Sequence, residues 1–177
     1  MDFILEERVE KARDLFRQGY NCSQSVFLAY NDLLGVESTL AATISGPLGG
    51  GMGRLREVCG AVSGMSLIAG FLAPCPDPAV RQAKAATYAL VQEFAERFRA
   101  ENGAIVCREL LGITTGAPLS PTPEARTENY YKKRPCPEIV REAAAIYCDH
   151  LCGVSFRGDD GDENASGSGK GNRDENG

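Results

Sequence analysis

Apolar side chains recur at helical spacing through most of this chain, and this period restricts its fold more than any other feature. Residues 4–16 carry them on one helical face, and Gly19 follows as a stop signal. No run of alternating apolar and polar residues is long enough to indicate a β-sheet. The sequence predicts an all-α fold, a compact single-domain bundle of about five to seven helices.

Capping residues indicate where further helices begin and end. A short helix is expected over about residues 38–44. The longest helix is expected to start with Asp77 as its cap and Pro78 at its first position, and to end at Asn102 and Gly103.

Length and composition fit one folded domain followed by a tail. The chain has 177 residues, of which 43% are hydrophobic, and this is enough for a substantial core without disulfides. From Arg157 onward no apolar residue is larger than alanine, so this segment cannot offset the entropy of ordering. We expect a folded all-α domain over residues 1–156 and a disordered tail, acidic and rich in glycine and serine, over residues 157–177.

Charge and hydropathy argue against nucleic-acid and membrane partners. The net charge is −5, and the largest basic cluster is Lys132, Lys133 and Arg134. The longest uncharged apolar stretch, residues 58–76, contains glycines and is shorter than the roughly 20 apolar residues of a membrane span. It is expected to form a buried helix, with no membrane insertion. The acidic N-terminal segment has no signal-peptide pattern, so a cytoplasmic protein is expected.

Four of the seven cysteines stand where the sequence indicates the start of a helix. Cys22 follows the expected cap Asn21, with Gln24 in the capping-box position, and is expected to be the first residue of its helix. A helix N-terminus presents unpaired N–H groups and the positive end of its dipole, which favour a thiolate or an anionic cluster. Cys136 is expected at a cap position. The set comprises Cys22, Cys59, Cys107 and Cys136.

A glycine-rich loop, residues 46–53, precedes the second of these cysteines. Its backbone N–H groups can point at a bound anion beside Cys59. The loop lacks the Gly-Lys-Ser/Thr of a P-loop and follows no strand, which argues against nucleotide binding. Gly60 and Gly64 share a helical face, so either a neighbouring backbone or a cofactor approaches there. The glycines expected beside a cofactor are Gly50, Gly51, Gly53 and Gly60.

Four thiolates form the usual ligand set of an iron–sulfur cluster and of a structural zinc site. Soft sulfur ligands select these metals over magnesium or calcium. The four cysteines lack the short Cys-x-x-Cys spacing of ferredoxins and zinc ribbons, because successive members are 37, 48 and 29 residues apart. They can meet only if the tertiary structure brings them together.

The other cysteines and the charges near the loop are expected to be structural or solvated. Cys148 and Cys152 share a helical face and are expected to pack as thiols, and Cys75 is a loop thiol. The single histidine, His150, belongs to no nucleophile or triad pattern, which argues against hydrolytic chemistry. Three charged residues beside the glycine-rich loop could set the charge near the site, but a solvated loop is the expectation; they are Arg54, Arg56 and Glu57.

Four short motifs follow one another along the chain. They read Asn-Cys-Ser-Gln at 21–24, Cys-Gly-Ala-Val-Ser-Gly at 59–64, Cys-Arg-Glu-Leu-Leu-Gly at 107–112 and Arg-Pro-Cys-Pro at 134–137. Together they resemble the redox-active protein family named C_GCAxxG_C_C, over residues 1 to about 153. The second motif departs from the family's spelling, because it reads Cys-Gly-Ala and not Gly-Cys-Ala.

The resemblance implies that the family's redox-active cysteines are Cys22, Cys59, Cys107 and Cys136 of this chain. The family is also similar to the non-haem part of split-Soret cytochrome c, which implies an iron–sulfur cluster as the cofactor. The chain has no Cys-x-x-Cys-His motif, so covalently bound c-type haem is not expected.

We therefore expect the four cysteines to converge on one site that binds an iron–sulfur cluster for electron transfer with a redox partner protein. Two alternatives stay open. In a metal-free thiol–disulfide oxidoreductase, two of the four would cycle through a disulfide. In a non-enzymatic module, the cysteines would hold structural zinc or no metal, and the protein would bind a partner. Assembly into a homo-oligomer is compatible with the sequence.

Overall fold

The computed structural model describes residues 3–153, in which helices are joined by turns and loops. It contains no β-strand, only a single antiparallel bridge between Val58 and Val106, so the predicted all-α fold is confirmed. The expected tail, residues 157–177, lies outside the described residues. The helices are α1 (Phe3–Arg17), α2 (Cys22–Tyr30), α3 (Ser38–Ser45), the 3-10 helix η1 (Gly46–Leu48), α4 (Gly60–Leu72), α5 (Arg81–Asn102), α6 (Cys107–Leu110), α7 (Glu128–Lys133) and α8 (Cys136–Leu151).

The eight α-helices of residues 3–153 exceed the expected number by one. The sequence gives no signal for α7, because its six residues, ENYYKK, have no apolar period. The helix nonetheless starts at Glu128, after the N-cap Thr127, whose side chain accepts a hydrogen bond from the N–H of Tyr130.

The start of α5 also differs from the expectation. The helix begins at Arg81 and not at Asp77, although its end at Asn102 and Gly103 is as predicted. The carboxylate of Asp77 accepts a 2.8 Å hydrogen bond from the N–H of Ala79, and the N–H of Val80 bonds to the carbonyl of Asp77. These bonds close a tight turn, and the helix starts only after it.

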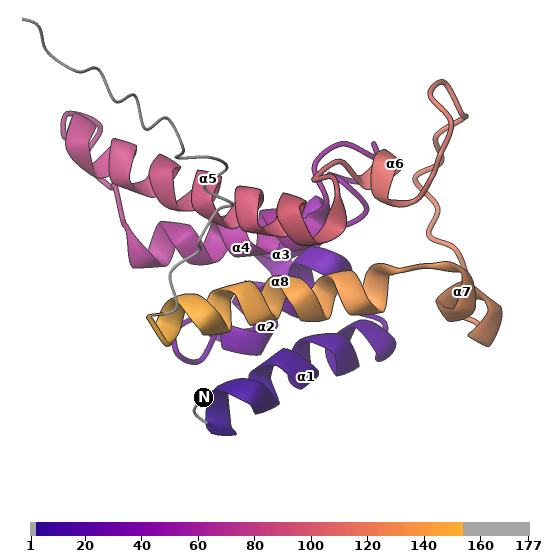
Figure 1. Ribbon diagram of the computed structural model, residues 1–177, viewed down its shortest axis with the longest axis horizontal. Coiled ribbons are helices and arrows are strands. Elements are labelled where there is room, and N and C mark those ends of the chain that lie inside the picture. The colour runs from indigo at the N-terminus through magenta and orange to yellow at the C-terminus, as the bar shows by residue number, and fades with distance from the viewer. Residues whose placement is uncertain (1–2, 154–177) are drawn as a thin grey trace, which may run out of the picture.

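Helix α8 runs through the middle of the bundle (Figure 1). It packs against α1 on one side and against α4 and α5 on the other, and α2 packs against α1, α4 and α8. The hydroxyl of Tyr30 in α2 donates a 2.8 Å hydrogen bond to the carbonyl of Ala144 in α8. The core between these helices contains large, almost fully buried side chains, namely Phe16, Phe27, Tyr30, Met65, Ile68, Phe94, Phe98 and Tyr147.

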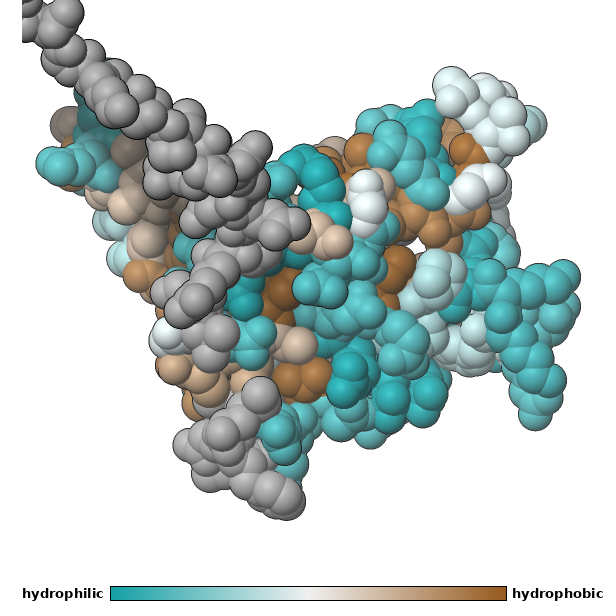
Figure 2. Space-filling view, viewed as in Figure 1, coloured by the Kyte–Doolittle hydropathy of each residue, from teal (hydrophilic) through white to brown (hydrophobic). Residues whose placement is uncertain are grey.

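The apolar stretch of residues 58–76 forms α4, a core helix as predicted, with Val62, Met65 and Ile68 buried. Among residues 3–153, no helix is both long and apolar enough to cross a membrane. Figure 2 shows a face on which hydrophilic side chains cover much of the surface and hydrophobic ones lie in smaller patches between them.

Two glycines of α4 face α2. A Cβ atom at Gly64 would lie 2.9 Å from Cβ of Val26 and 3.0 Å from the carbonyl of Ser23. A Cβ atom at Gly60 would lie 3.1 Å from Cβ of Cys22. Contacts under about 3.4 Å leave no room for a methyl group without movement of the helices. Of the two readings left open by the sequence, it is the backbone of a neighbouring helix that approaches these glycines.

Replacing Gly64 tests this contact against a control in the same helix. Gly64→Ala should lower the free energy of unfolding by about 2 kcal/mol, because the methyl group overpacks the α2–α4 interface. Gly70→Ala should leave it unchanged or raise it by about 0.5 kcal/mol, since nothing lies within 4 Å of the added atom and alanine favours the helix. Urea unfolding of both variants measures the difference. Equal effects would contradict the proposed packing.

An ion pair joins α1 to the turn after α2. The guanidinium of Arg8 donates two 2.7 Å hydrogen bonds to the carboxylate of Asp32 and one of 2.9 Å to the carbonyl of Ala29. Hydrogen bonding to Arg8 lowers the pKa of Asp32 from 3.8 to about 2. A carboxyl whose pKa is lower in the folded state stabilises that state above its unfolded pKa, and this contribution disappears as the pH falls through the folded pKa.

Asp32→Asn should therefore destabilise the protein at neutral pH by about 1 kcal/mol, a value reduced by the solvent exposure of the carboxylate. The difference from the unsubstituted protein should shrink as the pH falls from about 4 to about 2. Urea unfolding at several pH values checks this. Asp14→Asn, which removes an exposed acid of α1, is the control for charge alone. A pH-independent difference would show that the Arg8 pair is not its origin.

Candidate functional site

The structure brings the four motif cysteines to one end of the bundle, each at the start of a helix as predicted. Cys22, Cys107 and Cys136 are the first residues of α2, α6 and α8, and Cys59 is the N-cap of α4. Cys136 thus lies one position further into its helix than expected. In Figure 1 this is the end at which α8 begins and beside which α6 and α7 lie. The charge on each of the other three sulfurs affects the pKa of Cys22, so the four thiols share one electrostatic environment.

The capping box at the start of α2 holds Cys22 in place. The side chain of Asn21 accepts a hydrogen bond from the N–H of Gln24, and the Gln24 side chain accepts one from the N–H of Asn21, as predicted. The NH2 groups of both side chains also donate hydrogen bonds to residues outside α2. Asn21 donates to the carbonyl of Gly46, and Gln24 donates to the carbonyl of Ala42. These bonds tie the first turn of α2 to the end of α3 and to the start of the glycine-rich loop.

Cys22 and Cys136 form a hydrogen-bonded thiol pair. We assign the shared proton to Cys22, because Arg134 and Arg126 place positive charge near the sulfur of Cys136. The pKa of Cys136 is accordingly lowered, first by the hydrogen bond from Cys22 and then by these guanidinium groups. The pKa of Cys22 is raised, because its thiol donates that bond and because it is buried.

The start of α4 surrounds the sulfur of Cys59. The backbone N–H groups of Ala61 and Val62 lie near it and act to lower its pKa. Burial has the larger effect and raises the pKa of Cys59 to about 12. In the metal-free protein Cys59 is therefore a neutral thiol, although the first turn of α4 is already arranged to favour an anion.

Cys107 is attached to the glycine-rich loop by backbone pairing. Its N–H donates a 2.7 Å hydrogen bond to the carbonyl of Glu57, and the N–H of Cys59 donates one of 2.8 Å to the carbonyl of Ile105. This short antiparallel contact includes the bridge between Val58 and Val106. Cys59 and Cys107, which are 48 residues apart in sequence, become neighbours through it.

The glycine-rich loop has an unusual backbone. Residues 50–54 all have φ between 56° and 70°, and Arg56 has a φ of 64°. Three of these left-handed residues carry side chains, namely Met52, Arg54 and Arg56, and each such residue costs roughly 1–2 kcal/mol. Such strain persists only where the surrounding structure holds the backbone in place, and it is concentrated at functional sites.

Gly51 shows why this loop needs glycine. A Cβ atom there would lie 2.7 Å from Cβ of Cys107 and 2.8 Å from the backbone nitrogen of Glu57. Gly50 and Gly53 line the cavity at the site, whereas Gly60 packs against Cys22. The four glycines expected beside a cofactor thus all lie at this end of the bundle, two facing the cavity and two filling close contacts with site cysteines.

A cavity of about 240 Å³ lies among the cysteines, the loop and the segment before α8. Three of the four cysteines line it, and Cys59 lies behind them, 5% exposed. The other polar or charged residues of its lining are mostly cationic, namely Asn21, Arg54, Arg56, Glu124, Arg126, Tyr130 and Arg134. Of the larger charged side chains in this lining, only Glu124 is acidic.

Arginine side chains hold the segment that covers this cavity, residues 120–134. Arg126 donates hydrogen bonds to the carbonyls of Phe16 and Tyr20 and lies 4.3 Å above the ring of Phe16. The guanidinium groups of Arg126 and Arg134 both lie 4.9 Å from the ring centre of Tyr130. These cation–π contacts keep the two guanidinium groups, and therefore their positive charge, close to the thiols.

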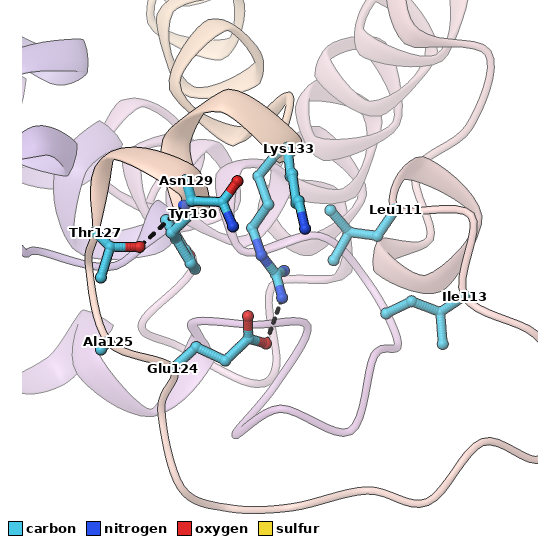
Figure 3. Close-up of a pocket in the computed structure, with 9 residues that line it drawn as sticks. Leu111, Ile113, Glu124, Ala125, Thr127, Asn129, Tyr130 and Lys133 are labelled. Carbon is cyan, nitrogen blue, oxygen red and sulfur yellow. Dashed lines mark hydrogen bonds and ion pairs between the residues drawn. The ribbon is translucent and has the colours of Figure 1, made fainter.

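A second, polar pocket of about 350 Å³ adjoins the cavity (Figure 3). Leu111 and Ile113 form one side of it, and Asn129 and Lys133 of α7 lie across from them. Glu124 also lines this pocket, and its carboxylate pairs with the guanidinium of Arg134. Residues common to both hollows are Leu111, Glu124, Tyr130 and Arg134.

The donor set at this end of the bundle consists of four thiols, which are ligands of iron–sulfur clusters and of structural zinc. Among residues 3–153, no three His, Cys, Asp or Glu side chains are arranged to hold one metal ion. Tetrahedral zinc, with bonds of about 2.3 Å, requires its sulfurs about 4 Å apart. A cluster distributes its thiolates over several irons, so its ligands lie further apart. The four cysteines and the nearby guanidinium groups could hold an anionic group of this kind.

The remaining cysteines lie away from this site. Cys148 and Cys152 are at the opposite end of α8 from Cys136, with their thiols in contact, and burial raises the pKa of Cys148 to about 11. Cys75 lies in the loop before α5. His150 packs edge-on against Phe94, with ring centres 5.2 Å apart. All seven cysteines are among the described residues, and each is a free thiol.

One expectation about the loop charges is wrong. Arg56 is not solvated but 8% exposed, with its guanidinium 3.9 Å from Sγ of Cys107. The sequence could not show this, because the left-handed backbone that turns Arg56 inward depends on tertiary contacts. Sequence analysis also missed Arg126, Glu124 and Tyr130. A signal existed only for Arg134, which stands two residues before Cys136.

The family profile described as "Putative redox-active protein (C_GCAxxG_C_C)" matches residues 20–150. The chain belongs to this family, and all four motif cysteines fall inside the matched region. No curated protein and no solved structure gives a significant match.

The close fit of Gly51 can be tested against another left-handed glycine of the same loop. Gly51→Ala should cost at least about 2 kcal/mol more folding stability than Gly53→Ala. Both variants add backbone strain at a positive φ, but a Cβ at Gly53 meets nothing closer than 3.9 Å. Urea unfolding of the two metal-free proteins gives the difference. Equal stabilities would show that Cys107 does not pack on Gly51.

Proposed function

We propose that this protein transfers electrons through an iron–sulfur cluster bound by Cys22, Cys59, Cys107 and Cys136. The observation that supports this most strongly is the convergence of four helix starts, each carrying a cysteine, on one cation-lined cavity. A structural role does not explain why thiols, N–H donors and arginines gather at one place. When bound, a cluster of this kind accepts one electron and releases it again.

The chain's own residues would prepare the site in three ways. The N–H groups of Ala61 and Val62 stabilise negative charge at the Cys59 sulfur. Arg126 and Arg134 do so at Cys136, and Arg56 does so at Cys107. The left-handed loop and its glycines allow the backbone to pass close to Cys107. Because these groups are placed before any cofactor binds, little reorganisation is needed when charge changes at the site.

The same proposal includes a partner and a location. An electron carrier needs a donor and an acceptor, so a redox partner protein is part of the proposed function. We further propose a cytoplasmic location, because free thiols persist in a reducing compartment and all seven cysteines are unbridged.

The contact between Cys22 and Cys136 favours a second candidate function, metal-free thiol–disulfide exchange. In that reaction the Cys136 thiolate would attack a substrate disulfide and release one substrate thiol. Cys22 would then attack the mixed disulfide, releasing the second substrate thiol and leaving a Cys22–Cys136 disulfide. This candidate gives no role to Cys59 or Cys107, and for that reason we place it second.

Cluster reconstitution under anaerobic conditions tests the first proposal. The unsubstituted protein should take up iron and sulfide and show an EPR signal in one redox state. Serine variants of Cys22, Cys59, Cys107 and Cys136 should each lose about nine-tenths of the bound iron. Cys75→Ser and Cys152→Ser are matched controls and should keep it. A colourless protein without iron after reconstitution would refute the proposal.

Thiol mapping separates the second candidate from the first. After mild oxidation of the metal-free protein, thiol–disulfide exchange predicts the reversible loss of two thiols and a mapped Cys22–Cys136 disulfide. The variants Cys59→Ser and Cys107→Ser should then retain exchange activity. Loss of all four thiols from labelling only when iron and sulfide are bound would instead support the cluster.

A further inference from the structure

Arg56 is a buried cation for which residues 3–153 offer no carboxylate within ion-pair distance. The residue is 8% exposed, and the one hydrogen bond that its side chain makes in the described structure is to Sγ of Cys107, at 3.9 Å. Burying a charge is costly unless an opposite charge lies beside it. Negative charge at the Cys107 sulfur, or on a group bound to that sulfur, would compensate this cost.

The backbone of Arg56 is held in place from both sides. Its N–H donates a 3.3 Å hydrogen bond to the carbonyl of Gly50, and its own carbonyl accepts bonds of 3.1 and 3.2 Å from Arg108. The residue has a φ of 64°, a conformation that costs a side-chain-bearing residue free energy. The loop therefore holds the backbone of Arg56 in a strained conformation that places its side chain beside Cys107.

Arg54 shows that this placement is specific. It lies two residues earlier in the same loop, with a similar φ of 69°. Its Nε donates a 2.8 Å hydrogen bond to the carbonyl of Ser120, and its guanidinium lies 3.7 Å from the carboxylate of Glu124. Arg54 thus holds the segment covering the cavity and has a carboxylate partner. Arg56 instead has a sulfur.

We infer that Arg56 is the counter-cation of the Cys107 sulfur and acts as a positioning residue of the four-cysteine site. Its guanidinium stabilises negative charge at this sulfur, whether on a thiolate or on a group bound to it. An added electron makes a thiolate-bound centre more negative, so a buried cation next to one of its sulfurs favours the reduced form. This last consequence rests on the proposed function, whereas the Arg56–Cys107 pair does not.

The pair can be tested in the metal-free protein with two alkylating reagents. Iodoacetate is an anion and iodoacetamide is neutral, and both react with the thiolate. The rate with iodoacetate divided by the rate with iodoacetamide at one cysteine therefore does not depend on its thiolate fraction. This ratio reports the local positive charge. At Cys107, Arg56→Gln should lower the ratio about threefold or more, and Arg56→Lys should restore most of it. Arg54→Gln, the matched control, should lower it less than half as much, because Arg54 lines the same cavity but pairs with Glu124. Peptide mapping by mass spectrometry reads each cysteine separately.

The redox consequence is measured on the reconstituted protein. Arg56→Gln should shift the equilibrium between oxidised and reduced centre about tenfold toward the oxidised form, which corresponds to a reduction potential about 59 mV lower for one electron. Arg54→Gln should give less than half of this shift. A purely structural role for Arg56 would change the unfolding temperature but not the potential of the folded protein.

The outcomes separate this inference from the proposed function. An unchanged rate ratio at Cys107 in folded Arg56→Gln overturns the inference, whether or not the protein binds a cluster. A lowered ratio in a protein that takes up no iron supports the pair and refutes the cluster. A lowered ratio with an unchanged potential removes the redox consequence. If Arg56→Gln does not fold, the same rate ratio is compared between two cysteines of the unsubstituted protein. It should be about threefold higher at Cys107 than at Cys75, and equal ratios would overturn the inference.

Discussion

The close packing of α2 against α4 is the contact on which the cysteine site depends. Gly60 and Gly64 let the two helices approach until Cys22, at the start of one, lies beside Cys59, at the start of the other. The antiparallel contact between residues 55–59 and 105–108 then adds Cys107. Packing of α8 on α1 and α2 adds Cys136. Each further cysteine joins through a separate contact, so the site forms only when the whole bundle does.

The stability of the bundle supports local strain at this site. A run of left-handed residues and a buried arginine are unfavourable by themselves. They persist because the surrounding helices bury a continuous aromatic and aliphatic core and because the loop is hydrogen-bonded along its length. The two features serve the same end, since the strained backbone brings both Gly51 and Arg56 to Cys107. Strain of this kind at a cysteine-lined cavity is typical of a functional site.

The two ends of α8 show how surroundings decide what a cysteine does. Cys136, at the N-terminal end, faces a cavity lined by guanidinium groups, and its pKa is lowered. Cys148, near the C-terminal end, is buried beside Cys152 and close to acidic residues, and its pKa is raised. The helix dipole adds to this contrast, because its positive end favours a thiolate at Cys136. One residue type thus acts as a site thiol at one end and as a packing thiol at the other.

The sequence by itself determined the all-α fold, most of the helices and the four cysteine motifs, because these depend on apolar period, local hydrogen bonding and short motifs. The capping box at Asn21 is an example, since both of its partners lie within one turn. Only the tertiary structure decided that the cysteines meet and that Arg56 turns inward. Those outcomes depend on contacts between residues far apart in the sequence or on strained backbone angles, for which local sequence carries no signal.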